Sequence, residues 1–388
     1  MKRIGIDARF FTDKATGIGK HVYELVQNLN NFEPEFHYTI FLNAEQFESF
    51  KLPGPNFKKV LSPFHHYSLS EQTSFCRQLN RAKFDLMVFP HFNAPILYKG
   101  KFVVTIHDLT LHHYPGKKKN KLHHRLAYKT LIKSVTKRAE HCFAVSENTK
   151  EDMINLLDIP EKKITVCYNG ISRQFHPLTT SDEIRWPSVE QRYELPAQYF
   201  LYTGVLRSHK NILGLVQAYA LFKQHNYKLN IKLVIAGPRD RIYLDEIIEH
   251  ALKLNLTING EDDITVKTAD VFFPGFIASE DMNLLIGKAK AYVFPSFYEG
   301  FGIPPIEAMQ CHTPVASSNT SSLPEACGEA ALYFDPHDIE EIAYALEKII
   351  LDGDLRKKLI NAGINQCEKF SWETMAKQML EKYVEILF

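Results

Sequence analysis

Short apolar runs alternate with longer amphipathic stretches along most of the chain. In the first half the apolar runs lie at residues 3–8, 37–42, 86–90, 102–106, 141–146 and 164–168. Several are apolar without interruption, such as Phe102-Val103-Val104, which is typical of strands buried on both faces. Residues 17–29, between the first two runs, have the apolar spacing of a helix. This alternation predicts a mostly parallel sheet that is covered by helices.

The alternation breaks once and then resumes. Pro177, Pro187 and Pro196 stand among polar residues and mark the best candidate linker. A second series follows, with apolar runs at 199–203, 231–236, 271–273, 291–294 and 314–316 and helical patterns at 213–224, 281–289, 305–311 and 339–351. We expect an N-terminal domain at 1–176, a linker at 177–198, a C-terminal domain at 199–371 and a terminal amphipathic helix at 372–388.

The predicted fold class is therefore α/β, with two Rossmann-like doubly wound domains. Ligands of open parallel sheets bind at the carboxyl ends of the strands. Two such sheets that face a central cleft would place their ligand in that cleft, which is the expected binding site.

Composition narrows the class of protein. The 388 residues are 45% apolar and 23% charged, as in a soluble globular protein. A net charge of +1 gives no general attraction to nucleic acid, so we expect no nucleic-acid partner. Because Asp7 and Arg9 interrupt the apolar pattern near the start, we expect no signal peptide, and no apolar run is long enough to span a bilayer. Six scattered cysteines without a CxxC pair favour a reduced, cytoplasmic setting, where they serve as small buried residues.

The most informative segment runs from Phe294 to Glu307. Glu299 and Glu307 flank a glycine-containing loop, Gly300-Phe301-Gly302, that leads from a predicted strand into a predicted helix. Glycines let a backbone approach a ligand closely, and the positive end of a helix favours a phosphate. Ionised carboxylates accept hydrogen bonds from sugar hydroxyls. The segment suits a phosphate that lies between two hydroxyl-rich groups, although two glutamates alone would fit a solvated surface loop.

This segment resembles the Glu, seven residues, Glu motif of the retaining GT-B glycosyltransferases of family 4, also called glycosyl transferases group 1. The resemblance covers essentially the whole chain and implies a metal-independent hexosyltransferase with no cofactor besides the nucleotide-sugar donor. It also implies that the domain at 199–371 binds the nucleotide sugar and that the domain at 1–176 is the acceptor-side domain. It implies that Glu299 contacts the donor sugar, that Gly300, Phe301 and Gly302 approach sugar and phosphate, and that Glu307 binds the ribose.

Further segments match the family pattern. Lys210 corresponds to the lysine that neutralises the diphosphate, while the neighbouring arginine of many members is here His209. Arg207 lies close enough in sequence to substitute for it. Such cations stabilise the charge that develops on a leaving diphosphate. A solvated surface lysine is the alternative for Lys210.

Three more positions complete the expected donor site. By resemblance, Gly17 and Gly19 close over the diphosphate from the first domain, and His107 at a strand end touches the donor sugar. Phe276 lies where the family binds the base. A structural histidine is the alternative for His107, and Asp108 would orient it or cap the next turn.

The segment Lys117–Arg138 contains nine Lys or Arg and no Asp or Glu. It is either a covering helix with a solvated basic face or a patch for peripheral contact with the inner face of a membrane. Neighbouring histidines lack a matched second pair of ligands, so we expect no metal. Asp352-Gly353-Asp354 is interpreted as a surface turn.

The predicted function is retaining transfer of a hexose to a glycan or lipid-linked acceptor in surface polysaccharide synthesis. The first-domain pattern resembles bacterial polysaccharide mannosyltransferases, including those of lipopolysaccharide, which favours GDP-mannose as donor. UDP-glucose or a UDP-N-acetylhexosamine remains an alternative, as do a phosphorylase or epimerase of similar fold and a non-catalytic nucleotide-sugar-binding protein.

Overall fold

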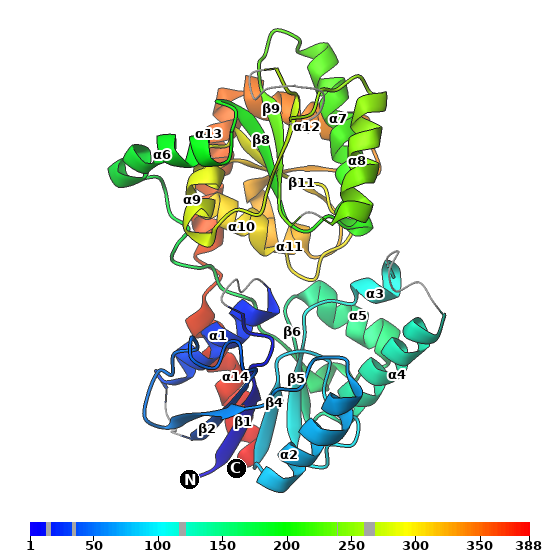
Figure 1. The fold of residues 1–388 in the computed structure, drawn as a ribbon, viewed down its shortest axis with the longest axis vertical. Helices are drawn as coiled ribbons and strands as arrows, with labels where there is room; N and C mark the ends of the chain where they lie inside the picture. Colours follow the sequence, from blue (N-terminus) through cyan, green and yellow to red (C-terminus); the bar gives the residue numbers. More distant parts are fainter. Residues whose placement is uncertain (13–16, 33–35, 116–121, 239, 260–267) are drawn as a thin grey trace. The chain divides into compact units, whose positions relative to one another are not determined.

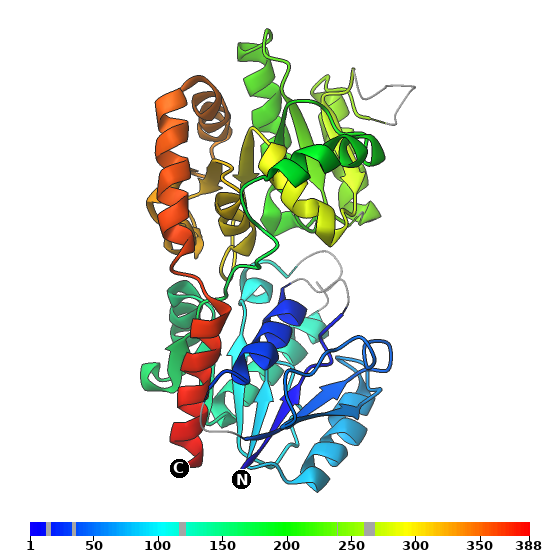
Figure 2. The ribbon, with the colours of Figure 1, turned by 90° about the vertical axis from the view of Figure 1, so that its left-hand side faces the viewer.

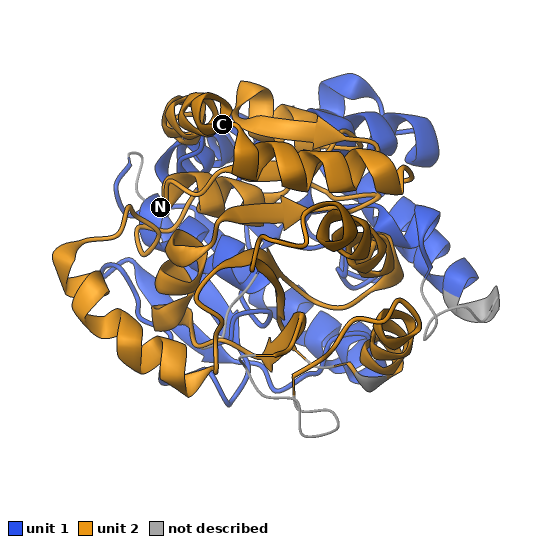
Figure 3. Ribbon diagram, turned by 90° about the horizontal axis from the view of Figure 1, so that it is seen from above, with its two compact units in different colours: residues 1–170, 370–388 blue, residues 171–369 orange. Residues whose placement is uncertain are grey.

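The computed structural model describes residues 1–12, 17–32, 36–115, 122–238, 240–259 and 268–388. Two compact units divide the chain. The first unit comprises residues 1–170 and 370–388, and the second comprises residues 171–369 (Figure 3). Each has its own parallel sheet, as predicted.

The first unit is built on a seven-stranded sheet in the order β3-β2-β1-β4-β5-β6-β7, with every described pairing parallel. Its strands are β1 (Arg3–Asp7), β2 (His37–Leu42), β3 (Phe57–Leu61), β4 (Leu86–Phe89), β5 (Phe102–Ile106), β6 (His141–Ala144) and β7 (Ile164–Val166). The strands β4, β5 and β6 are buried throughout, which explains their uninterrupted apolar sequences.

Helices cover both faces of this sheet (Figure 1). One apolar core joins β1 and β2 to α1 (Ile18–Leu29) and α14 (Trp372–Leu387). The other lies under α2 (Cys76–Ala82), α4 (Leu122–Arg138) and α5 (Glu147–Leu157). Shorter elements are a π-helix, η1 (Glu71–Phe75), a helical turn, α3 (Thr110–His113), and a 3₁₀ turn, η2 (Glu161–Lys163).

The second unit has a six-stranded parallel sheet in the order β10-β9-β8-β11-β12-β13. Its strands are β8 (Tyr199–Thr203), β9 (Lys232–Ala236), β10 (Val271–Gly275), β11 (Ala291–Phe294), β12 (Val315–Ser318) and β13 (Ala331–Phe334). The edge strand β13, like β3 in the first unit, is absent from the predicted series. Both are half-exposed in part, so their sequences lack a continuous apolar run.

Helices pack on both faces of the second sheet as well. The helices α7 (Ile212–His225), α8 (Arg241–Lys253) and α12 (Ile339–Leu351) pack together, and α10 (Ile303–Gln310) packs with α11 (Leu323–Cys327) and α13 (Gly353–Cys367), as Figure 1 shows. The remaining elements are α6 (Thr180–Arg192), which packs on α9 (Ser279–Lys288), and the 3₁₀ turns η3 (Ser208–Lys210) and η4 (Gly328–Ala330).

Two predicted boundaries differ from the structure. The proposed linker 177–198 holds helix α6, which begins with a capping box at Thr179 and Asp182 and continues through Pro187. The terminal helix 372–388 belongs to the first unit, because the apolar face of α14 lies against α1 (Figure 2). The chain passes from the first unit to the second between residues 170 and 171 and returns to the first unit between residues 369 and 370. The predicted boundaries were at residues 176 and 371.

Each sheet has one point where its strand order reverses. In the first unit this switch lies between β1 and β4, and in the second between β8 and β11. The loops that leave such a pair of strands diverge to opposite faces, which opens a crevice at the carboxyl edge of the sheet. These two edges are where ligand-binding side chains are expected.

Candidate active site

Lys210 and Glu299 meet at the switch point of the second unit. Lys210 ends the turn η3 after β8, and Glu299 stands in the loop after β11. The Nζ of Lys210 donates to both carboxylate oxygens of Glu299, at 2.6 and 2.8 Å. The two side chains are only 15% and 13% exposed, so water screens the pair less than a surface ion pair. The sequence prediction singled out both residues, and the structure brings them together.

The loop after β11 is fixed by two serines. The backbone N–H of Glu299 donates to Ser321 Oγ at 2.9 Å, and Ser322 Oγ donates to the carbonyls of Glu299 and Phe301 at 3.0 and 2.8 Å. A backbone hydrogen bond of 2.8 Å from Phe297 to the carbonyl of His209 ties this loop to η3. The carboxylate of Glu299 is therefore held in place from the backbone side.

Gly302 ends the predicted glycine loop in the left-handed region, with φ of 109°, and caps α10. A Cβ at this position would lie 2.7 Å from Leu323, so only glycine fits there without a shift. Gly300 and Phe301 are buried beside it. The positive end of α10 consequently lies at the same edge as Lys210.

Glu307 is half-buried in the first turns of α10. Burial and the negative charges of Glu307 and Glu299 raise the pKa of Tyr292, a residue of β11. Both carboxylates therefore act on the same side chain. The hydroxyl of Tyr292 is satisfied by a 2.7 Å hydrogen bond with Thr203 at the end of β8.

Arg207 and Phe276 occupy exposed positions in the second unit. The guanidinium of Arg207 lies 5.8 Å from the ring centre of Tyr243. Phe276 is 49% exposed and follows β10 directly.

Three glycines that the sequence analysis did not single out line the ends of neighbouring strands. Gly204, Gly237 and Gly275 follow or end β8, β9 and β10 and have φ of 150°, 155° and 81°. A Cβ on Gly237 would lie 1.9 Å from the carbonyl oxygen of Gly204. The backbones of Gly204 and Gly237 therefore pack more closely than a side chain at Gly237 would allow. A glycine directly after the apolar runs 199–203 and 231–236 was the available signal for these two.

His107 lies at the end of β5, as predicted, with a second histidine against it. Its ring is perpendicular to that of His21 in α1, with ring centres 4.8 Å apart. The Nε2–H of His107 donates to the carbonyl of Pro90 at 2.8 Å, which leaves Nδ1 as the acceptor. Burial lowers the pKa of His107 to about 4 despite that hydrogen bond.

His21 is buried, and its Nδ1–H donates to Asn169 Oδ1 at 2.8 Å. Burial, followed by the neighbouring His107, lowers its pKa to about 3. Both imidazoles are therefore neutral near pH 7.

Gly17 caps α1 with φ of 57°, and nothing lies within 4 Å of where its Cβ would be. Gly19, two residues further along in the first turn of α1, is buried. Thr16, which belongs to the same predicted motif, lies outside the described residues.

The basic segment falls only partly within the described structure. Residues 117–121 lie outside it, and the rest forms most of α4. The exposed side of α4 carries Leu126, Lys129, Lys133 and Lys137. Asp352, by contrast, caps α13 by accepting from the N–H of Leu355 at 2.9 Å, which confirms the surface-turn interpretation.

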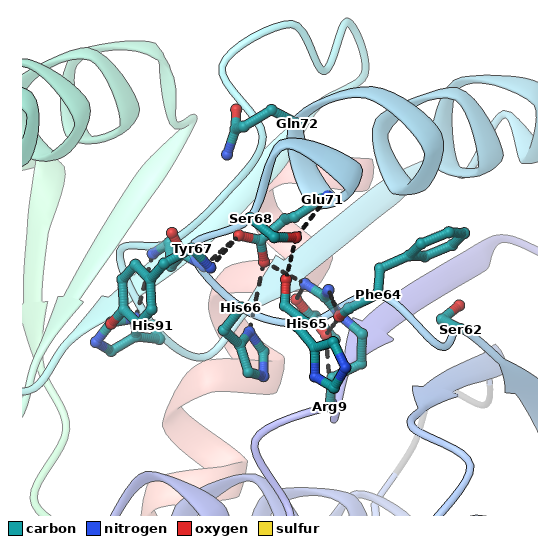
Figure 4. A network of polar contacts seen from close by, with 12 residues as sticks. Arg9, Ser62, Phe64, His65, His66, Tyr67, Ser68, Glu71, Gln72 and His91 are labelled. Carbon is teal, nitrogen blue, oxygen red and sulfur yellow. Dashed lines mark hydrogen bonds and ion pairs between the residues drawn. The ribbon is translucent and has the colours of Figure 1, made fainter.

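The first unit also contains a buried charge network that sequence reasoning missed. Arg9, 2% exposed, pairs with Asp7 and with Glu71, each at 2.7 Å (Figure 4). Asp7 ends β1 and Arg9 lies two residues beyond it. Charged residues at the end of an apolar strand were the available signal for buried charges at a sheet edge.

Comparison with known proteins identifies the family. Residues 189–366 match the family Glycosyl transferases group 1, and residues 15–175 match Glycosyltransferase Family 4. The O-antigen chain mannosyltransferase B of Escherichia coli is 30% identical over 296 residues, which cover 76% of this chain and 72% of that protein. The chain belongs to the group 1 glycosyltransferases. It is an enzyme that transfers a glycosyl group, as the motif at Glu299 indicated.

Other matches define how far this glycosyltransferase resembles its relatives. The serotype-specific mannosyltransferase WbdA of Escherichia coli is 30% identical over 250 residues, or 64% of this chain but only 29% of WbdA. Sucrose-phosphate synthase from Thermosynechococcus elongatus has a TM-score of 0.75 at 20% identity, covering 100% and 99% of the two chains. HepE from Anabaena, solved with UDP and glucose, has a TM-score of 0.74 at 16% identity, covering 99% and 100%. These structures confirm the GT-B fold.

Among the described residues, no helix combines the length and apolarity that a bilayer crossing requires. No group of three His, Cys, Asp or Glu side chains in that part of the chain is placed to hold a metal ion.

Proposed function

We propose that this enzyme transfers a hexose, with retention of configuration, from a nucleoside diphosphate sugar to a glycan or lipid-linked acceptor in surface polysaccharide synthesis. The observation that carries the proposal is the Lys210–Glu299 pair at the switch point of the second sheet. It sets a cation for the diphosphate beside a carboxylate for the sugar hydroxyls, next to the positive end of α10.

Each residue has a distinct task in this scheme. Lys210 and Arg207 neutralise the diphosphate as it leaves, with the loop Gly300–Gly302 and α10 adding the field of the helix end. Glu307 accepts from the ribose hydroxyls, and Phe276 lies near the base. Gly17 and Gly19 approach the diphosphate from the first unit. No metal and no cofactor besides the donor enters the scheme.

The reaction itself is a substitution at the anomeric carbon. The acceptor oxygen bonds to that carbon as its bond to the phosphate oxygen breaks, and the proton of the acceptor hydroxyl passes to the leaving diphosphate. The neutral His107, with Nδ1 as acceptor, receives a hydrogen bond from a donor-sugar hydroxyl. No covalent sugar–enzyme intermediate is part of the proposal.

GDP-mannose is the proposed donor and mannose the transferred sugar, because relatives that match over most of this chain are named mannosyltransferases. UDP-glucose is the rival donor, since HepE was solved with UDP and glucose.

A thermal-shift series with GDP, UDP and ADP, each with and without EDTA, tests the donor and the lack of a metal requirement. We expect GDP to raise the melting temperature most, by an amount that EDTA does not change, because a ligand bound only by the folded state stabilises it. A larger shift with UDP would replace the proposed donor base. No shift with any nucleotide would overturn the proposed function.

The exposed side of α4 supports peripheral contact with an anionic membrane as a further part of the proposal. Lys129, Lys133 and Lys137 stand on one side of the helix with Leu126, which is 65% exposed. Each lysine near such a surface contributes about 1 kcal/mol. Co-sedimentation with phosphatidylglycerol-containing vesicles should exceed that with pure phosphatidylcholine, and Lys129→Glu with Lys137→Glu should abolish the difference.

A further inference from the structure

A buried histidine in the first turn of α1, His21, contacts residues from three separate parts of the first unit. Its ring centre lies 4.8 Å from that of His107 at the end of β5, with the ring planes at 88°, and 6.2 Å from that of Trp372, with the planes at 75°. Its Nδ1–H donates to Asn169 Oδ1 at 2.8 Å. His107 is the histidine proposed to contact the donor sugar, so His21 packs directly against a proposed donor contact.

Two of these three contacts come from the crossing segments, which we define as residues 168–170 and 370–372, where the chain leaves the first unit and returns to it. The crossing segments pack on each other, since a Cβ at Gly170 would lie 2.6 Å from Cγ of Trp372. Only glycine fits there without a shift. The side chain of His21 is therefore held by two pieces of chain that are also packed against each other.

The burial of His21 has an energetic cost that packing alone would not require. The side chain is 1% exposed, and its Nε2 has no hydrogen-bond partner among the described residues. Nε1 of Trp372, which contacts it, is buried and unpaired in the same way within that part of the chain. A buried polar atom without a partner is destabilising, and an apolar side chain at position 21 would avoid that penalty. The histidine is therefore better explained by what it holds in place than by the stability of the core.

The backbone of His21 connects it to the turn that contains Gly17 and Gly19. Its N–H donates to the carbonyl of Gly17 at 3.0 Å. The proposed function assigns both glycines to the diphosphate and His107 to the sugar. One residue thus joins the two parts of the first unit that are assigned to the donor.

The orientation of His107 depends on its neighbours. Its Nε2–H donates to the carbonyl of Pro90 at 2.8 Å, which fixes one end of the ring. The torsion that turns an imidazole about its Cβ–Cγ bond is broad, so one hydrogen bond leaves the ring room to swing. The perpendicular ring of His21 limits that swing, because edge-to-face packing favours one arrangement of the two planes. It thereby keeps Nδ1 of His107 directed for a hydrogen bond, whose strength falls steeply with its angle.

We propose that His21 is a positioning residue for glycosyl transfer. It holds the imidazole of His107 in the orientation that receives the hydrogen bond of the donor sugar, and the crossing segments hold His21. This inference rests on the proposed function. A loss of alignment at the reacting sugar reduces turnover more than it reduces donor affinity, since the nucleotide contacts proposed for the second unit are unchanged. In this scheme His21 itself touches no substrate.

Steady-state turnover, with the donor that the thermal-shift series selects, is the first test. We expect His21→Leu, which removes the ring and the hydrogen bond to Asn169, to lower kcat by about tenfold or more while the donor KM changes by about twofold or less. His21→Phe keeps a ring against His107 and should recover kcat to within about threefold of the wild type. An equal loss in both variants, or a wild-type kcat in His21→Leu, would overturn the proposal.

NMR spectra of isotope-labelled histidine side chains give a readout that a merely structural role would not move. In the wild type we expect one Nε2-protonated tautomer for His107, whose signals are identified by their loss in His107→Gln. In His21→Leu an Nδ1-protonated population should appear as well, because the ring is free to leave the carbonyl of Pro90. Trp372→Leu leaves both histidines in place and should show a smaller change of the same kind, with kcat lowered by about threefold. Unchanged His107 signals in both variants overturn the proposal even where turnover falls.

His141→Leu is the matched control, because this histidine is also buried in the first unit, at 5% exposure, and its Nε2 pairs with Thr165 Oγ1 at 2.8 Å. It should lower the melting temperature without changing kcat or the His107 signals. A fall in kcat equal to that of His21→Leu would mean that lost stability explains both, and would overturn the inference. A wild type without turnover or any nucleotide-induced thermal shift overturns the proposed function instead, and the His107 spectra then still decide whether His21 positions that ring.

Discussion

Lys210 and Glu299 are 89 positions apart in the sequence, yet Nζ of the lysine bridges both oxygens of the carboxylate at 2.6 and 2.8 Å. The pair connects the two loops that diverge at the centre of the second sheet. A cation already paired in this way is aligned before a ligand arrives, but its charge is partly neutralised. In the proposed function, a diphosphate must therefore compete with Glu299 for Lys210.

This competition predicts opposite effects for the two residues. Glu299→Gln removes the competing charge, so the affinity for GDP should rise by about threefold while turnover falls by about 100-fold or more. Lys210→Ala should weaken GDP binding by about tenfold or more. Calorimetric GDP titration and donor turnover measure the two effects. A Glu299→Gln enzyme that binds GDP as weakly as Lys210→Ala would show that the carboxylate does not compete.

Glu307 should affect nucleotide binding more than chemistry. If it accepts from ribose hydroxyls, Glu307→Ala loses hydrogen bonds to a charged acceptor, a cost of about 1.5–3 kcal/mol and hence about tenfold or more in affinity. Turnover at saturating donor should change by about threefold or less. Glu368→Ala, an exposed carboxylate on the same unit, is the matched control. A fall in saturated turnover with unchanged affinity would reverse the assigned role.

Two histidines of the first unit that pack against each other, His21 and His107, predict an acid-sensitive fold. The pKa of His21 is lowered to about 3 and that of His107 to about 4, from an ordinary value of 6.5. Between about pH 6.5 and pH 4 the unfolded chain binds more protons than the folded one, so the free energy of unfolding falls as the pH falls. Their contribution is complete above about pH 6.5 and is lost progressively below it.

Urea unfolding at a series of pH values measures this slope. Each histidine contributes up to about 1.4 kcal/mol per pH unit to the slope of the unfolding free energy against pH. His21→Leu should remove the contribution of His21 to this slope, whatever the substitution does to the stability at pH 7.5. His141, whose pKa burial lowers to about 4, keeps part of the slope in that variant. An unchanged slope in His21→Leu would mean that His21 binds protons equally in both states.

Gly237 should be among the least replaceable positions in the second unit. Gly237→Ala places a Cβ 1.9 Å from the Gly204 carbonyl oxygen, at φ of 155°, and should cost about 3 kcal/mol or more in stability. Gly353→Ala is the matched control, because nothing lies within 4 Å of its Cβ and it begins helix α13. That change should stabilise by up to about 1 kcal/mol. Equal melting temperatures for the two variants would contradict the close packing at Gly237.

The sequence predicted the fold class and most elements because buried parallel strands have uninterrupted apolar runs. It failed where that signal weakens. The edge strands β3 and β13 include half-exposed residues, and helix α6 contains Pro187. The helix α14 has an amphipathic pattern, but no local signal shows which sheet its apolar face covers.

The site was predictable where a motif lies in one continuous segment. Glu299 and Glu307 belong to such a motif, and Lys210 follows a strand closely. The Arg9–Glu71 contact was not predictable, because it joins positions 62 residues apart and depends on a π-helix that has no sequence signature.

The packing of α14 on the first unit also determines the order in which the protein can fold during synthesis. Residues 370–388, with the buried Trp372, Met375 and Tyr383, leave the ribosome only after the whole of the second unit. The second unit is one continuous segment and can fold as soon as it emerges, whereas the unit translated first must wait with part of its core exposed. An expressed fragment of residues 171–369 should therefore be stable, and one of residues 1–170 should aggregate.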